Sequence, residues 1–377
     1  MKIIKISRFI IKYKWEFILF SIFLIYLLII RIIIPVIKIP FLGIFNYDWD
    51  SYFRMSNDIT LIFKKNIVAP FCYRPLAPFI AGLLPFDLET NYILLNFITV
   101  YLTGIMLYYT LRLNFNRILS AIGLFFFCYL NYIEVIYNPP SFFEVSPFYH
   151  IYFYEIYNVD TLALLMIMIC FYCILNSKKI FYSIFLVFGI LTKETILFTI
   201  PVFIINIYLK SNPLMSKREK FYNLSKNLIY IIPGLAIYFI LHYAIIPRSI
   251  MGTVWQFYYQ GNEYFSIDMI MIFVNQRISD ILYGVGLFQW TVGTWGLIMI
   301  LLISFNTIKE LSKWIKLFGI FMLLIYCQMF LGIAVKKYIF YGFFPMIYLS
   351  ISGLQSLNEG LRNYFNNGFL KYLLIFY

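Results

Sequence analysis

Long apolar runs separated by short polar segments dominate the hydrophobic pattern of the chain. Many of them approach the roughly 20 residues that an α-helix needs to cross a bilayer. They predict membrane-spanning helices over residues 17–37, 92–111, 118–137, 158–176, 180–192, 195–209, 227–247, 281–305, 317–335 and 338–355. The run over 180–192 is short, and we expect it to continue past Thr192 or to break near it. The runs are continuous rather than alternating between apolar and polar positions, which argues against a membrane β-barrel.

The composition agrees with this pattern. Of the 377 residues, 62% are hydrophobic, 22% are aromatic and only 12% are charged. The mean hydropathy is +0.83, whereas a soluble protein carries about a quarter charged residues. We therefore expect an all-α polytopic membrane protein with about ten transmembrane helices. We expect residues 1–377 to form a single integral-membrane domain.

The charges predict an orientation in the membrane. The basic N-terminal segment precedes an apolar run that is too long for a signal peptide and lacks a small-residue cleavage site, so it predicts a retained first span with a cytoplasmic N-terminus. The inner segments are then 1–16, 112–117, 177–179, 210–226, 306–316 and 356–377. They carry 19 of the 30 lysines and arginines, as the positive-inside rule requires. The net charge of +13 therefore lies in short loops between spans, and we expect no nucleic-acid partner.

Acidic residues are distributed in the opposite way. Thirteen of the seventeen lie at or near the outer face, where the two longest non-spanning stretches, 38–90 and 248–280, also lie. Acidic residues have little influence on insertion, so this bias indicates chemistry on the outer side. The stretch 38–90 is rich in aromatic and apolar residues, and we expect it to form amphipathic helices at the membrane interface. Ordinary solvated loops are the alternative, above all for 248–280.

Two aspartates open the first outer loop, in the segment NYDWDSYFR. In an extended or turned backbone, the side chains of Asp48 and Asp50 would project to one side. Together they could bind a divalent cation such as Mg²⁺ or Mn²⁺, or one could act as a general base whose pKa its neighbour raises. In a continuous helix they would diverge by about 200°. The alternative is that Asp50 caps a helix.

Four further charged residues are candidates for the same site. Arg74 lies among prolines and aromatics in PFCYRPLAPFI, where the prolines at 70, 75 and 78 oppose a regular helix, and could clamp a phosphate or pair with lipid headgroups. Asp160 opens a long apolar run, either as a helix cap or facing an outer cavity. Lys193 and Glu194 lie between two short apolar segments, where charges are costly and indicate function. Adjacent helical residues point about 100° apart, so we expect separate partners for these two.

Other motifs contribute less. His150 and Glu144 lie in an outer loop and are candidate supporting residues, whereas His242 lies within a predicted span. Two histidines make no His-based metal site, and there is no Walker A, GxSxG or HExxH motif, which argues against soluble-type ATPases and zinc proteases. Cys170 and Cys173 form a CxxC inside an apolar run, where packing is the expected role.

The order of these features resembles the GT-C superfamily of integral-membrane glycosyltransferases. The resemblance covers roughly residues 1–210: one span, a large outer loop with an acidic motif, YRPLAPFI, YNVDTLALL and GILTKETILFTIP. It implies a GT-C-like catalytic part over 1–210 and a variable transmembrane part over 211–377.

The resemblance also implies an activity. It implies a polyprenyl-phosphate sugar donor and transfer on the outer face of the membrane. Asp48 or Asp50 would be the base or metal ligand, and Arg74 and Lys193 would neutralise the donor phosphate, supported by Asp160. Many members carry a soluble C-terminal domain, but only about twenty residues follow the last predicted span here, so we expect a lipid or glycan acceptor.

Two expectations complete the prediction. A transporter or flippase of lipid-linked glycans would share this hydropathy, but such proteins often contain internal repeats, and neither DWD nor LTKET has a counterpart after residue 210. Other membrane transferases and a structural assembly protein are weaker alternatives. The abundance of Ile, Lys, Asn, Phe and Tyr is typical of an AT-rich genome and favours a bacterial cytoplasmic (inner) membrane, with membrane lipids as neighbours.

Overall fold

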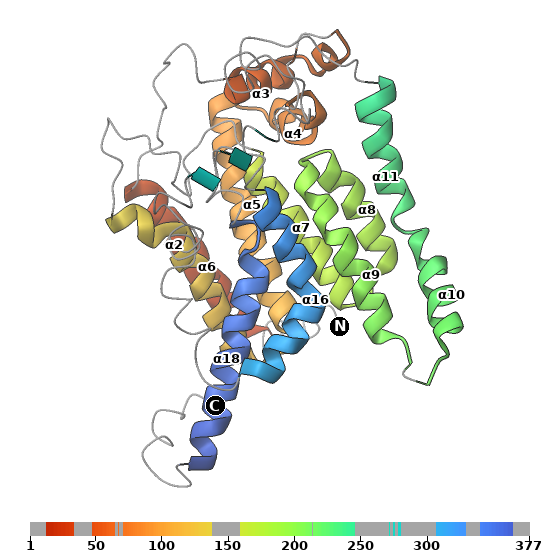
Figure 1. Ribbon diagram of the computed structural model, residues 1–377. Coiled ribbons are helices and arrows are strands. Elements are labelled where there is room, and N and C mark those ends of the chain that lie inside the picture. The colour runs from red at the N-terminus through yellow and green to blue at the C-terminus, as the bar shows by residue number, and fades with distance from the viewer. Residues whose placement is uncertain are drawn as a thin grey trace, which may run out of the picture.

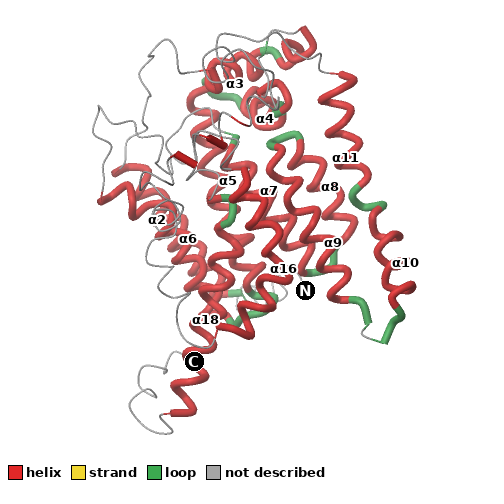
Figure 2. Tube along the Cα trace, viewed as in Figure 1, coloured by secondary structure: helices red, strands yellow, loops and turns green. Residues whose placement is uncertain are grey.

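The computed structural model describes most of the chain. The described residues are 13–33, 47–64, 67, 71–137, 159–212, 214–245, 271, 274, 275, 278, 279, 307–328 and 340–364. Of these, the backbone alone is described at 33, 47–50, 64, 131–137, 243–245, 307–310 and 357–364. This part of the chain forms helices joined by short turns and contains no strand (Figure 2).

The helices form a bundle with its long axes roughly aligned (Figure 1). Its members are α2 (Lys14–Ile33), α5 (Leu88–Leu111), α6 (Arg117–Tyr137), α7 (Asp160–Leu175), α8 (Lys179–Ile190), α9 (Thr199–Lys210), α16 (Thr307–Gln328) and α18 (Phe343–Tyr364). Helix α7 lies at the centre, where it packs against α5, α8 and α9. Phe171 of α7 also packs against Phe318 and Phe321 of α16 and Phe344 of α18. Helices from both ends of the chain therefore share one hydrophobic core.

The structure supports a membrane protein, but it confirms fewer spans than the ten predicted. Three helical segments of the described chain are long and apolar enough to cross a bilayer: Lys14–Ile32, Leu88–Leu111 and Leu311–Gln328. A fourth span is obtained if α10 (Lys217–Leu228) and α11 (Ile232–Phe239), which are bent by 49°, count as one. Helices α7 and α8 are shorter, as is Arg117–Leu130, the part of α6 whose side chains the structure describes. The predicted span 281–305 lies outside the described residues.

The predicted break near Thr192 is confirmed. Helix α8 ends at Ile190, and a 3₁₀ turn, η4 (Glu194–Phe198), precedes α9. The amide groups of Thr192 and Lys193 both donate to the carbonyl oxygen of Gly189, at 2.9 and 2.8 Å, which closes the end of α8. The chain therefore reverses direction at this point, so α8 and α9 run in opposite directions, and each packs against α7.

Helices between α2 and α5, in the predicted first outer loop, cover one end of the bundle (Figure 1). They are α3 (Tyr47–Asn57), η1 (Ile59–Lys64), η2 (Phe71–Tyr73) and α4 (Leu76–Leu83). On α3, Tyr52 and Met55 are buried while Phe53 and Arg54 are exposed, the one-sided pattern expected of an amphipathic helix. The buried face packs in a second core, together with residues of α4, α5 and α7.

The prolines of PFCYRPLAPFI shape this segment differently from the prediction. They were expected to oppose a regular helix, yet α4 begins directly after Pro75 and contains Pro78. Pro78 lies in the first turn of α4, where the backbone amide has no intrahelical acceptor, so a proline costs little there. Helix α4 approaches α3 closely at Gly82, where an added Cβ would lie 2.3 Å from the carbonyl oxygen of Ser56.

Candidate functional site

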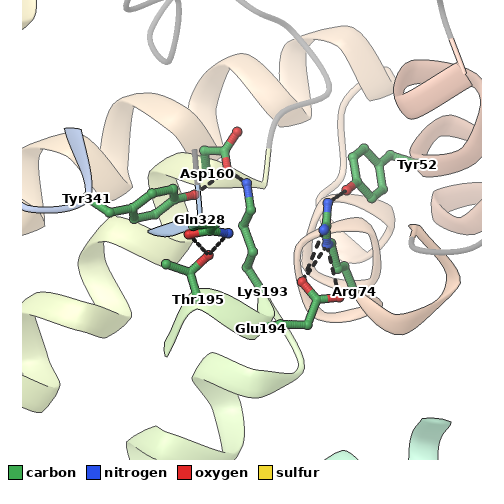
Figure 3. Close-up of polar contacts among 8 residues, drawn as sticks. All are labelled: Tyr52, Arg74, Asp160, Lys193, Glu194, Thr195, Gln328 and Tyr341. Carbon is green, nitrogen blue, oxygen red and sulfur yellow. Dashed lines mark hydrogen bonds and ion pairs between the residues drawn. The ribbon is translucent and has the colours of Figure 1, made fainter. Parts of the chain in front are cut away.

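The candidate site lies where several helix ends meet, next to the helices of the predicted first outer loop. Asp160 is the first residue of α7, Gln328 is the last of α16, and Tyr341 precedes α18. Lys193 and Glu194 lie in the turn between α8 and α9, and Arg74 lies between η2 and α4. Figure 3 shows these side chains converging from segments that are far apart in the sequence.

Asp160 is the centre of a buried polar cluster. Its Oδ1 accepts hydrogen bonds from the Lys193 Nζ and the Tyr341 hydroxyl (Figure 3). The Lys193 ammonium also lies over the Tyr341 ring, 5.2 Å from its centroid. All three side chains are buried, so the opposite charges of Lys193 and Asp160 compensate each other where water cannot.

A second ion pair lies beside the first. The Arg74 Nε and one terminal nitrogen each lie 3.0 Å from the Glu194 Oε2. The other terminal nitrogen of Arg74 donates to the Tyr52 hydroxyl of α3 at 3.3 Å. The side chains of Arg74 and Glu194 retain 12% and 24% of their exposure. This pair is therefore more accessible than the Asp160–Lys193 pair.

The backbone at Lys193 explains why two adjacent residues serve different pairs. Lys193 has φ −166° and ψ 141°, and in extended backbone successive side chains point to opposite sides. Lys193 thus reaches toward α7 while Glu194 reaches toward α4. The prediction of separate partners for these residues is confirmed, although the cause is an extended residue rather than helical geometry. Leu76 stabilises the arrangement, since its amide donates to the Leu191 carbonyl at 3.1 Å.

Three residues of the site, Tyr52, Gln328 and Tyr341, were not singled out from the sequence. Tyr52 lies inside the segment NYDWDSYFR, but nothing in that segment indicated that its hydroxyl belongs to the site. Gln328 exchanges hydrogen bonds with Thr195 at 3.1 and 3.5 Å, and a lone amide within the predicted span 317–335 could have indicated it. Tyr341 lies in an aromatic-rich segment, where nothing marks one tyrosine over another.

The backbone at the two aspartates differs from the expected conformation. The predicted cation site shared by both side chains required an extended or turned backbone at this segment. The alternative prediction placed Asp50 at a helix cap. Asp48 and Asp50 instead both lie within α3, which begins at Tyr47. Positions two apart diverge by about 200° around a helix, so this backbone does not place the pair on one face. His150 and Glu144 lie outside the described residues.

Arg74, Asp160, Lys193 and Glu194 are brought together, as expected of one site. The same contacts pair each of the two predicted phosphate-binding cations with a carboxylate. An incoming phosphate would therefore have to share or replace a carboxylate partner.

The cysteines near the site offer no nucleophile. Cys72 is buried in η2, and burial raises the pKa of its thiol to about 12, with a further contribution from the charge of Glu194. Such a thiol stays protonated at physiological pH, and the thiolate is the reactive form. Cys170 and Cys173 are buried in the core of the bundle, which confirms their expected packing role. Among the described side chains, no group of three or more His, Cys, Asp or Glu residues could hold a metal ion.

Comparisons with known proteins found no matching family model, no matching curated protein and no matching solved structure. The resemblance to the GT-C superfamily therefore rests on the motifs of residues 1–210 alone.

Proposed function

We propose that this chain is a membrane-embedded glycosyltransferase. It transfers a sugar from a polyprenyl-phosphate donor to a lipid or glycan acceptor at the outer face of a bacterial cytoplasmic membrane. One observation carries the proposal: Arg74, Lys193, Asp160 and Glu194, all singled out from the sequence, meet at one end of an apolar bundle. A donor with a lipid tail would reach such a site from the bilayer.

The donor phosphate binds at Arg74. A guanidinium presents a planar fork that matches carboxylates and phosphates alike. In the structure Glu194 occupies this fork, and its partial exposure allows it to yield to a phosphate. Lys193, fixed by Asp160 and Tyr341, contributes a second positive charge from deeper in the bundle.

The backbone of helix α3 favours one of the two candidate aspartates. Position 48 lies four residues before Tyr52, so the two positions share a face of α3, whereas position 50 lies about 200° from position 48. Tyr52 contacts Arg74, which favours Asp48 as the residue that acts at the site. Asp48 would serve as general base or as the ligand of a divalent cation. A single carboxylate with phosphate oxygens suffices to hold Mg²⁺.

The reaction is an inverting displacement. The acceptor oxygen attacks the anomeric carbon and loses its proton to a base, while the bond from that carbon to the phosphate oxygen breaks and the electron pair stays on the phosphate. Arg74 stabilises the charge that develops on this leaving group.

The test measures sugar transfer by the protein reconstituted in liposomes with polyprenyl-phosphate sugars. We compare the wild type with Asp48→Asn, Asp50→Asn, the double variant and Arg74→Lys. Asp58→Asn is the matched control, because Asp58 lies in the same loop but hydrogen-bonds locally to Thr60.

We expect Asp48→Asn to lower kcat by about 10²–10⁴-fold if it is the base, and Asp50→Asn to have little effect. Arg74→Lys, which loses the fork, is expected to raise the donor KM. Full activity in the double aspartate variant would remove the aspartates from the site. A wild-type protein that transfers no sugar from any such donor would refute the proposed function.

A transporter or flippase is the second candidate, and one observation favours it. The buried Asp160–Lys193 pair is the kind of intramembrane charge pair that substrate pathways use. The discriminating measurement follows a labelled lipid-linked glycan across the proteoliposome bilayer. Translocation without a new glycosidic bond supports the flippase, and transfer without translocation supports the glycosyltransferase.

A further inference from the structure

We infer that His242 is the proton acceptor for the acceptor hydroxyl at the Arg74–Glu194 end of the site. This inference rests on the proposed function and assigns the base to a residue outside the predicted set. It leaves Asp48 with the role of cation ligand.

The imidazole of His242 is held between two tyrosine rings. It stacks on Tyr73 with ring centroids 3.9 Å apart and an interplanar angle of 22°. On its own helix it lies 4.1 Å from the Tyr238 ring, at 33°. Tyr73 is the chain neighbour of Arg74, so this stack places the imidazole at the edge of the Arg74–Glu194 pair. With its ring faces covered, the imidazole can bind a further group only through its edge.

The hydrogen bond of the Nδ1 atom determines whether the Nε2 atom at the ring edge can accept a proton. The Nδ1 atom lies 2.9 Å from the carbonyl oxygen of Tyr238. A carbonyl oxygen only accepts, so Nδ1 carries the proton and donates it. In the neutral ring the Nε2 atom then has a free lone pair. Nε2 has no hydrogen-bond partner in the part of the chain that the structure describes.

The surroundings of the imidazole combine two opposite charges with aromatic rings. The charged groups that act on the imidazole are Glu194 from η4 and Arg74 from the η2–α4 connection, and the tyrosines are Tyr73 and Tyr238. The charge of Glu194 favours a protonated imidazole, and the charge of Arg74 opposes it. His242 lies in a π-helical turn, Ile240–Ile245, and such turns are frequent at functional sites.

The proposed step balances as follows. The acceptor hydroxyl donates its hydrogen bond to Nε2, and its proton moves to Nε2 as its oxygen bonds to the anomeric carbon. The bond from that carbon to the donor phosphate oxygen breaks, and the phosphate keeps the electron pair. The resulting imidazolium and Arg74 then both face the phosphate anion.

The first experiment uses the fact that the chain has only two histidines. Histidine labelled with ¹⁵N in the full-length protein in nanodiscs gives two sets of ring signals, and His242→Gln assigns them. We expect the neutral His242 ring to carry its proton on Nδ1. A proton on Nε2 in the neutral ring would overturn the inference, whether or not sugar transfer is detected.

The second experiment measures kcat against pH for sugar transfer. We expect the wild type to lose activity as the pH falls and the imidazole becomes protonated. His242→Gln should lower kcat by about 10²–10⁴-fold and abolish that limb of the profile. If the limb persists in His242→Gln and is lost in Asp48→Asn, Asp48 is the base and the inference is overturned, while the proposed function stands.

Chemical rescue separates base catalysis from packing. His242→Ala leaves a gap between the Tyr73 and Tyr238 rings that a small aromatic ring can fill. Added imidazole should restore part of the activity, whereas pyrrole, which has the same ring size but no basic nitrogen, should not. Equal rescue by both compounds would show a packing role and overturn the inference. A wild-type protein without transfer activity would refute the proposed function. Only the tautomer measurement would then still test the inference about His242.

Discussion

The Asp160–Lys193 pair permits a quantitative test of the site as a structural unit. The perturbation is a double-mutant cycle of Asp160→Asn, Lys193→Met and the two changes combined. Both variants keep the approximate size of the side chain and remove its charge. The side chains retain only 3% and 7% of their exposure, so each single variant leaves an uncompensated charge away from water.

The burial of the pair determines how much each variant should destabilise the protein. Exposed ion pairs contribute about 0–1 kcal/mol, whereas removal of one partner from a buried pair costs about 3–5 kcal/mol. The cost of Asp160→Asn should lie near the lower end of this range, because an amide oxygen can still accept a hydrogen bond from the Tyr341 hydroxyl. Lys193→Met leaves a buried carboxylate and should cost more. The double variant buries no charge at this pair, so its cost should be smaller than the sum, with a coupling energy of about 1–3 kcal/mol.

The assay is reversible denaturation of the purified protein in mild detergent, followed by circular dichroism. The same cycle at Arg74 and Glu194 is the matched control, because that pair is more exposed and should show weaker coupling. Additive effects at Asp160 and Lys193, or single costs below about 1 kcal/mol, the range of exposed pairs, would refute the reasoning that the pair is a buried unit.

Three further predictions concern the segment that carries the outer helices. Gly82→Ala should destabilise the protein by about 1–3 kcal/mol, because the added Cβ would lie 2.3 Å from the Ser56 carbonyl oxygen; an unchanged thermal midpoint would contradict this. Asn91→Ala should lower the free energy of unfolding by about 1–3 kcal/mol, since the buried Asn91 amide donates to three carbonyl oxygens at 2.9–3.0 Å. Thermal unfolding of this variant, compared with that of Asn91→Asp, measures the loss. Hydrogen bonds from the hydroxyl and then the amide of Thr90 hold the pKa of Asp87 below its ordinary 3.8. This carboxylate therefore stabilises α5 above that pH and loses the effect as the pH falls through its folded pKa, so the unfolding temperatures of wild type and Asp87→Ala should differ at pH 7 and converge in acid.

Local patterns were sufficient for several features of the fold. The continuous apolar runs predicted helices because such segments bury their backbone hydrogen bonds internally, and α5 and α6 lie close to the predicted spans 92–111 and 118–137. The short run over 180–192 predicted a continuation past Thr192 or a break near it, and the structure shows the break. The charges of Lys193 and Glu194 predicted separate partners, which the structure also shows. These properties depend on neighbours in the sequence, which a pattern can reveal.

The bounds of α7 and α8 lie within a few residues of the predicted spans 158–176 and 180–192. Helix α7 has 16 residues and α8 has 12, which at 1.5 Å per residue are shorter than the roughly 30 Å of a bilayer core. Both end at polar residues of the site, since Asp160 begins α7 and Lys193 follows α8. The structure therefore does not confirm that either helix crosses a bilayer by itself.

The sequence by itself determined that this chain is apolar and helical and that its charged residues near the site gather in a few segments, and it left open a continuation past Thr192 or a break near it. The tertiary structure alone decided the partners: Asp160 for Lys193, Glu194 for Arg74, and the hydroxyls of Tyr341 and Tyr52 beside them. It also decided that Asp48 and Asp50 belong to a helix. The physical reason is that these contacts join residues 22 to 181 positions apart. Such contacts arise from packing of whole helices, which no local pattern encodes.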